Sequence, residues 1–131
     1  MKVAVVGSRN FSDYAKVKDY LDRLNAMRGI DTIVSGGAKG ADSLGEKWAR
    51  ENRVKTLIFE AKWDDVTHPG AVIKSNQWGK KYDATAGFRR NKQIIEAADV
   101  VLAFWDMRSP GTKDSVEYAR KIKKPIKIIQ V

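Results

Sequence analysis

The chain has 131 residues, of which 25 are lysine or arginine and 16 are aspartate or glutamate, giving a formal net charge of +9. This length predicts one domain with a single core, and the charge favours an anionic partner: a nucleotide, nucleic acid or an acidic membrane surface. With no cysteine and one histidine, His68, the sequence excludes disulfides, thiolate metal sites and the common zinc sites, and we expect no metal and no cofactor. No apolar run is long enough for a signal peptide or a membrane span, so we expect a cytoplasmic protein with no membrane partner.

Strands and helices are expected to alternate along the chain. Predicted helices follow a candidate N-cap at Ser12 and the residue Asp42, and two more bury Ile94 with Ile95 and Val116 with Ala119. The predicted strands are runs of mostly apolar residues, which favours a parallel sheet buried on both faces. They span Lys2 to Val6, Thr32 to Ser35, Lys55 to Phe59, Val100 to Trp105 and Ile126 to Val131. The sequence therefore predicts an α/β fold in which residues 1–131 form one Rossmann-like domain, a three-layer sandwich with a mainly parallel sheet of about five strands.

One long irregular segment, from Ala61 to Asp83, interrupts this alternation. Connections of this length are often functional loops. Trp63, Trp78 and Tyr82 lie within it and either stack on a nucleobase or anchor the loop to the core. His68, before a Pro-Gly turn, is interpreted as structural or exposed.

The stretch Ile33 to Asp42 runs from a strand through a glycine-rich turn into a helix. We expect Gly36, Gly37 and Gly40 to adopt positive φ and to let an anion, most plausibly a phosphate, approach the helix N-terminus. The motif differs from the Walker A and dinucleotide-binding patterns. The alternative is that the glycines only close a tight turn and that the Asp42 carboxylate caps the helix.

Polar and glycine residues also follow two other predicted strands, at Gly7 to Asn10 and at Ser109 to Thr112. In open α/β sheets, ligands bind beyond the carboxyl ends of the strands, so these motifs predict one pocket. Ser109 and Thr112 have the alternative role of helix caps. The pair Arg89-Arg90 either forks onto an anion or is solvated surface.

Fourteen residues are predicted to bind the ligand of this pocket. They are Gly7, Ser8, Arg9, Ser35, Gly36, Gly37, Lys39, Gly40, Asp42, Arg90, Asn91, Ser109, Gly111 and Thr112. A second basic group is interpreted as a solvated helix end, with a nucleic-acid footprint as the alternative. It comprises Arg120, Lys121, Lys123, Lys124 and Lys127.

Taken together, six ordered motifs resemble the YspA-like branch of the SLOG superfamily, which includes the DNA-processing protein DprA/Smf and the LOG phosphoribohydrolases. The motifs are Val5 to Arg9, Val34 to Asp42, Phe59 to Trp63, Ala86 to Asn91, Ala98 to Asp106 and Ser109 to Thr112. The resemblance spans nearly the whole chain and implies a Rossmann-like domain with a nucleotide-type pocket. It also suggests a homodimer.

The resemblance leaves the activity open, because the superfamily includes hydrolases, sensors and DNA-binding proteins. Arg90 lies where the LOG enzymes have an arginine, but Ser115 stands where they have a glutamate. Cleavage of an N-glycosidic bond needs a carboxylate, so binding without turnover, as a sensor or sequestering module, is the leading hypothesis. For the alternative, a phosphoribohydrolase, the candidate catalytic residues are Arg90, Asp42, Asp114 and Glu117. A third hypothesis, from the resemblance to DprA and the charge, is a single-stranded nucleic-acid-binding accessory protein.

Overall fold

The computed structural model describes residues 1–62, 73–75, 81–83 and 85–131. Seven strands and four helices lie in this part of the chain. In order they are β1 (Lys2–Gly7), α1 (Tyr14–Arg28), β2 (Thr32–Ser35), α2 (Ala41–Glu51), β3 (Lys55–Ile58), β4 (Ile73–Ser75), β5 (Lys81–Asp83), α3 (Ala86–Ala97), β6 (Val100–Trp105), α4 (Pro110–Lys121) and β7 (Ile126–Gln130). The five predicted strands are all present, with their ends shifted by at most one residue.

The main sheet is parallel throughout, with the strand order β3-β2-β1-β6-β7. From β1 the chain winds first toward β3 and later, after α3, toward β7, so the strand order reverses between β1 and β6. Gly7 at the end of β1 is in register with Phe104 of β6. The fold therefore confirms a Rossmann-like α/β architecture and places its topological switch point at the carboxyl ends of these two strands.

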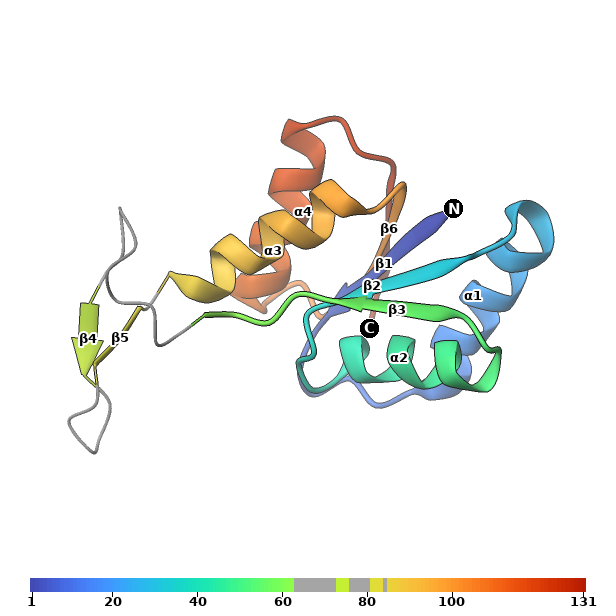
Figure 1. Cartoon of the computed structure of the whole chain (residues 1–131), viewed down its shortest axis with the longest axis horizontal. Helices are drawn as coiled ribbons and strands as arrows, with labels where there is room; N and C mark the ends of the chain where they lie inside the picture. Colours follow the sequence, from blue (N-terminus) through green and yellow to red (C-terminus); the bar gives the residue numbers. More distant parts are fainter. Residues whose placement is uncertain (63–72, 76–80, 84) are drawn as a thin grey trace.

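Two helical layers cover the sheet, with α1 and α2 on one face and α3 and α4 on the other (Figure 1). Successive residues of β1 point to opposite layers. Val3 and Val5 join the core cluster that contains Trp48 of α2, whereas Ala4 and Val6 pack in the other cluster. This alternation explains the uninterrupted apolar run in the sequence, because both faces of a central strand are buried.

The edge strand β3 departs from that expectation. All four of its residues are exposed, Leu57 and Ile58 among them. A strand at the edge of a sheet has only one neighbour, and here the helical layers leave both of its faces accessible to solvent. The prediction that the strands are buried on both faces is therefore wrong for β3, although correct for β1.

The segment interpreted as irregular also contains a structured part, because β4 and β5 pair as an antiparallel two-stranded sheet. Each strand has three residues and two of the three are polar or charged, so neither gave a strand pattern in the sequence. Trp63, His68 and Trp78 lie outside the described residues, and so does the side chain of Tyr82. Their predicted roles stay predictions.

Helix α1 begins one residue later than predicted. Asp13, not Ser12, is the N-cap, and its Oδ1 accepts a hydrogen bond from the Lys16 amide at 3.2 Å. Among the described residues, no helix combines the length and the hydropathy needed to cross a bilayer.

Candidate functional site

A cavity of about 410 Å³ opens at the switch point, between the end of β1 and the helices α3 and α4. Its volume lies within the range of about 300 to 1,000 Å³ that small-molecule sites occupy. We refer to it as the switch-point cavity. Its lining residues are Val6, Gly7, Arg9, Ala38, Asp42, Gly87, Phe88, Arg90, Asn91, Ser109, Pro110, Gly111, Thr112 and Ser115.

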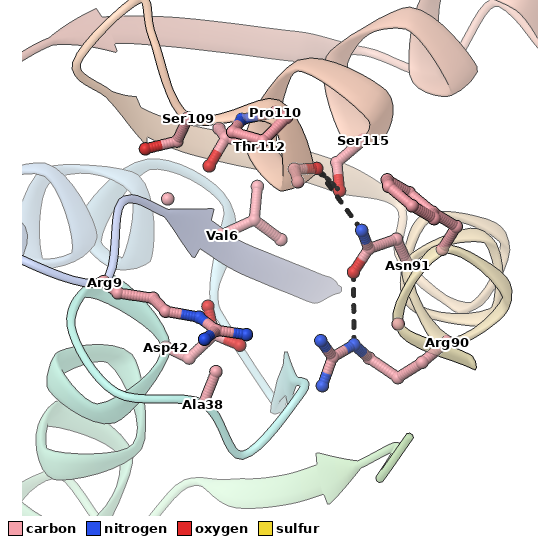
Figure 2. Close-up of a pocket in the computed structure, with 14 residues that line it drawn as sticks. Val6, Arg9, Ala38, Asp42, Arg90, Asn91, Ser109, Pro110, Thr112 and Ser115 are labelled. Carbon is pink, nitrogen blue, oxygen red and sulfur yellow. Dashed lines mark hydrogen bonds between the residues drawn. The ribbon is translucent and has the colours of Figure 1, made fainter. Parts of the chain in front are cut away.

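The polar side chains reach the switch-point cavity from three directions (Figure 2). Arg9 and Asp42 lie together on one side, Arg90 and Asn91 project from α3 on another, and the turn before α4 forms the third. Val6, from the end of β1, contributes apolar surface. The cavity therefore combines cations, a carboxylate, an amide and hydroxyl groups around a partly apolar centre.

The turn between β6 and α4 is held by its own aspartate. Asp106 accepts hydrogen bonds from the amides of Arg108, at 2.8 Å, and Ser109, at 2.7 Å, and these lower its pKa to about 2. The Ser109 hydroxyl forms hydrogen bonds with Asp106 and Ser8, and its side chain makes no capping hydrogen bond to the amides at the start of α4. Ser109 is thus the N-cap residue by position, but its predicted capping hydrogen bond is absent.

Helix α4 opens with Pro110, Gly111 and Thr112, all of which line the switch-point cavity. Pro110 has no amide hydrogen and the Lys113 amide donates to the Ser109 carbonyl at 3.0 Å, which leaves the amides of Gly111 and Thr112 as the donors at this end. The helix dipole makes this end positive. No atom lies within 4 Å of the position that a Cβ on Gly111 would occupy, apart from its chain neighbours and the helix backbone. An anionic group therefore has both donors and space at this end of α4.

A chain of hydrogen bonds crosses one wall of the cavity. Arg90 Nη1 donates to the Gly36 carbonyl at 2.9 Å, and its Nε donates to Asn91 Oδ1 at 3.1 Å. Asn91 Nδ2 in turn donates to the Gly111 carbonyl at 3.3 Å. These contacts fix the orientation of the Arg90 guanidinium, and they connect the turn after β2 with the start of α4.

Three charged side chains influence one another at the cavity. Burial raises the pKa of Asp42 to about 6, against the opposing effects of the Gly36 amide and the positive Arg90. Burial also lowers the pKa of Arg90, while Asp42 acts to raise it and the neighbouring Arg9 to lower it. Two guanidinium groups close enough to interact at one cavity favour an anionic occupant.

The turn after β2 differs from its prediction. Gly37 and Gly40 have positive φ, +69° and +83°, but Gly36 does not. Asp42 does not cap α2, whose N-cap is Gly40; its Oδ2 instead accepts a hydrogen bond from the Gly36 amide at 3.0 Å. Because Arg90 binds the carbonyl of the same glycine, both backbone polar groups of Gly36 are occupied by protein atoms.

Eight of the fourteen predicted binding residues line the switch-point cavity: Gly7, Arg9, Asp42, Arg90, Asn91, Ser109, Gly111 and Thr112. The other six are not among its lining residues: Ser8, Ser35, Gly36, Gly37, Lys39 and Gly40. Ser8 and Ser35 have structural partners instead. The buried Ser8 hydroxyl accepts from the Asp106 amide at 3.1 Å, and the Ser35 hydroxyl donates to Glu46 at 3.1 Å.

Six lining residues, most of them small or apolar, are not among the fourteen: Val6, Ala38, Gly87, Phe88, Pro110 and Ser115. Ala38 and Pro110 lie within the predicted motifs, and no pattern in the sequence indicated Val6, Gly87 and Phe88 as lining residues. Of the candidate carboxylates, only Asp42 lines the cavity; Asp114 and Glu117 do not. Glu117 is exposed and lies 3.8 Å from the ammonium of Lys113. In the described ranges, no three histidine, cysteine or acidic residues gather to form a metal site.

Comparison with known proteins yields one family and several relatives. Residues 1–65 match the model of the YspA, cpYpsA-related SLOG family. The chain is also similar to the gene 61 protein of Mycobacterium phage D29, with 34% identity over 133 residues, 95% of this chain and 93% of that protein.

Solved structures share the fold. DprA from Streptococcus pneumoniae has a TM-score of 0.75 and 27% identity, over 99% of this chain and 50% of its own. DprA from Helicobacter pylori, described with a single-stranded DNA binding mode, has a TM-score of 0.67 and 25% identity, over 98% of this chain and 64% of its own. The protein TM1055 is similar in fold alone, with a TM-score of 0.62 and 23% identity, over 95% of this chain and 71% of its own. The chain thus spans less than two thirds of either DprA.

Proposed function

Because this chain belongs to the YspA, cpYpsA-related SLOG family, and because two guanidinium groups and a helix N-terminus converge on one cavity, we propose that it binds a nucleotide or nucleotide-derived molecule. The convergence of Arg90 with the start of α4 is the observation that carries this proposal. Both favour a phosphate, and Arg90 is already oriented by its bonds to Gly36 and Asn91. The function is that of a sensor or a sequestering module.

The rest of the cavity suits the remainder of a nucleotide. Phe88 lines the cavity and is 43% exposed, so its ring offers an apolar surface for a nucleobase. The Asp42 carboxylate can accept a hydrogen bond from a ribose hydroxyl, and the Thr112 hydroxyl can donate one to a phosphate. In this proposal the phosphate occupies the Arg90 and α4 side, and the base lies toward Phe88.

Calorimetric titration with the four nucleoside 5′-monophosphates, the unphosphorylated nucleosides and ribose 5-phosphate tests the proposal. We expect at least one monophosphate to bind more tightly than its nucleoside and than ribose 5-phosphate. Arg90→Ala should weaken that binding by about 1.5 to 3 kcal/mol, and Arg90→Lys should recover only part, since a lysine lacks the guanidinium fork. Arg28→Ala is the control, because Arg28 is an exposed residue at the end of α1. Equal affinities for the parent and Arg90→Ala would contradict the proposal.

We expect binding without turnover. Ser115 lines the cavity where the LOG enzymes have a glutamate, and its hydroxyl donates to the Gly111 carbonyl at 3.3 Å. Chromatography should therefore find the nucleoside monophosphates intact after long incubation with excess protein. Release of free base that Arg90→Ala abolishes would establish a phosphoribohydrolase instead. Asp42→Asn would then test Asp42 first, ahead of Asp114 and Glu117, because it alone of the three lines the cavity.

A second candidate function is binding of single-stranded nucleic acid, supported by the similarity to the H. pylori DprA over 98% of this chain. The basic group at Arg120 and Lys121 lies at the C-terminal end of α4, whereas the cavity lies at its N-terminal end. Lys124 donates to the carbonyl of Ala98, which gives it a structural role. These positions favour the helix-end interpretation of that group over a nucleic-acid footprint.

Fluorescence anisotropy with a labelled DNA single strand separates the two functions. A protein that neutralises several phosphates loses orders of magnitude in affinity between about 50 and 200 mM salt. A loss of this size, together with a weaker salt dependence after Lys121 and Lys127 are substituted, would support strand binding. No binding at low salt would exclude it.

A further inference from the structure

A second cavity, of about 440 Å³, lies on the other side of the first turns of α3, against the segment that follows β3. Lys62 and Glu60 line it from that segment, and Arg89, Arg90 and Lys92 line it from α3. Among the described residues of its lining, Glu60 is the one carboxylate and four side chains are cationic, so this part of the lining has a net positive charge.

Arg90 lines both cavities. Helical periodicity explains how one residue can line both cavities. Gly87 and Asn91 lie on one side of α3 and Ala86 and Gln93 lie on another, with Arg90 between them. Its guanidinium also holds the Gly36 carbonyl. Arg90 therefore lies at the boundary between the two cavities, and a ligand in one of them lies beside the other.

The cations of the second cavity differ in what they already contact. Arg89 Nη1 donates to the Thr85 hydroxyl at 2.7 Å, and the Lys92 ammonium lies 5.7 Å from the centre of the Tyr118 ring. Lys62 lies on the opposite wall from α3. An anion between these walls would meet a lysine on one side and one or two guanidinium groups on the other, the arrangement that phosphate groups favour.

We propose that the second cavity binds a second phosphate of the same ligand, so that the ligand is a nucleotide whose two phosphates are separated by a nucleoside. A phosphodiester-linked dinucleotide and the 5′ end of a longer strand share this chemistry. In either case Arg90 lies between the two phosphates, Lys62 and Arg89 bind the second, and Glu60 opposes it. This inference rests on the proposed function, because it assumes that the first phosphate occupies the switch-point cavity.

Calorimetry with three probes tests the inference: the best-binding nucleoside 5′-monophosphate, the 5′-phosphorylated dinucleotide of the same base, and a 5′-phosphorylated strand of about 20 residues. We expect the dinucleotide to bind the parent protein about tenfold more tightly than the monophosphate. Lys62→Gln and Arg89→Gln should each reduce that advantage several-fold, and Glu60→Gln should increase it, while the monophosphate affinity stays the same. Lys121→Gln, at the far end of α4, should change neither affinity.

The outcomes separate the two proposals. If the monophosphate binds but the dinucleotide binds no more tightly, or if Lys62→Gln weakens both equally, the second phosphate site is wrong and the proposed function stands. If neither the monophosphate nor the dinucleotide binds the parent protein, the proposed function and the second phosphate site are both wrong. If the strand binds the parent protein as tightly as the dinucleotide does, the second phosphate comes from the end of a nucleic acid. If the strand fails to bind, the ligand is a free dinucleotide.

Discussion

Two glycine-containing turns follow strands at the same edge of the sheet, and their glycines serve different purposes. In the turn after β2, a Cβ on Gly40 would lie 2.2 Å from the Ser8 carbonyl oxygen, and one on Gly36 would lie 2.9 Å from Arg90 and from Asp42. At the start of α4, a Cβ on Gly111 would meet no atom within 4 Å apart from its chain neighbours and the helix backbone. The first turn is packed against the protein itself at Gly36 and Gly40 and reaches the switch-point cavity only at Ala38, whereas Gly111 faces open space there.

This difference shows that a glycine-rich turn is not by itself evidence of a ligand. A glycine permits close approach of any group, and the approaching group can be another part of the same chain. After β2 these groups are the Ser8 carbonyl, the Asp42 carboxylate and the Arg90 guanidinium. The first turn therefore positions Asp42 and Arg90 at the cavity, and under the proposed function it acts on the ligand through these two side chains.

Gly40→Ala is expected to have the largest effect. An alanine would have to adopt the φ of +83° and place its Cβ against the backbone of Ser8 and Arg9. We expect the free energy of unfolding to fall by about 3 to 5 kcal/mol, the range of strained backbone combined with a steric clash. Urea denaturation of the parent and of Gly40→Ala measures this difference in the free energy of unfolding. A loss below about 1 kcal/mol would mean that the turn is not tightly packed.

Asp42 should make stability depend on pH through the same turn. Its pKa rises from 3.8 in the unfolded chain to about 6 in the folded protein, so the folded protein binds the proton more tightly. The free energy of unfolding should therefore fall as the pH rises from about 4 to 6, by an amount of the order of 2 to 3 kcal/mol. Asp42→Asn should remove this contribution, which urea denaturation at pH 4 and pH 7 would detect.

The matched control for this pH dependence is Asp31→Asn. A hydrogen bond with Thr32 lowers the pKa of the exposed Asp31, so its contribution has the opposite sign and is lost as the pH falls. If Asp42→Asn and the parent show the same pH dependence, the Asp42 carboxylate is not buried as the structure has it.

Gly111→Ala should have the smallest effect on folding. The added methyl meets open space and the position is helical, so the free energy of unfolding should stay the same or rise by up to about 1 kcal/mol. Nucleotide affinity should fall nevertheless, because the methyl narrows the space beside the first amides of α4. Denaturation and calorimetry on the same preparation separate the two readouts. A large loss of stability would remove the contrast between the two turns.

The sequence predicted the sheet and the location of the cavity, because both depend on local patterns. Apolar runs identified the five strands, and the chain order placed Gly7 and Ser109 at the same edge. The partners of the turn after β2 were not predictable in this way. Arg90 lies 54 positions from Gly36, and its guanidinium binds the backbone of the turn that the anion was expected to approach. Phe88 was missed because a single aromatic on a helix gives no signal that distinguishes a cavity wall from a core contact.

Backbone amide chemical shifts, measured while the best-binding nucleoside 5′-monophosphate is added to the isotopically labelled protein, compare the two turns most directly. We expect the amides of Asn91, Gly111 and Thr112, which line the switch-point cavity, to shift most. Gly37 and Lys39, which do not, should shift little. Large shifts at Gly37 and Lys39 with none at Gly111 and Thr112 would show that the phosphate binds at the turn after β2 and not at the start of α4.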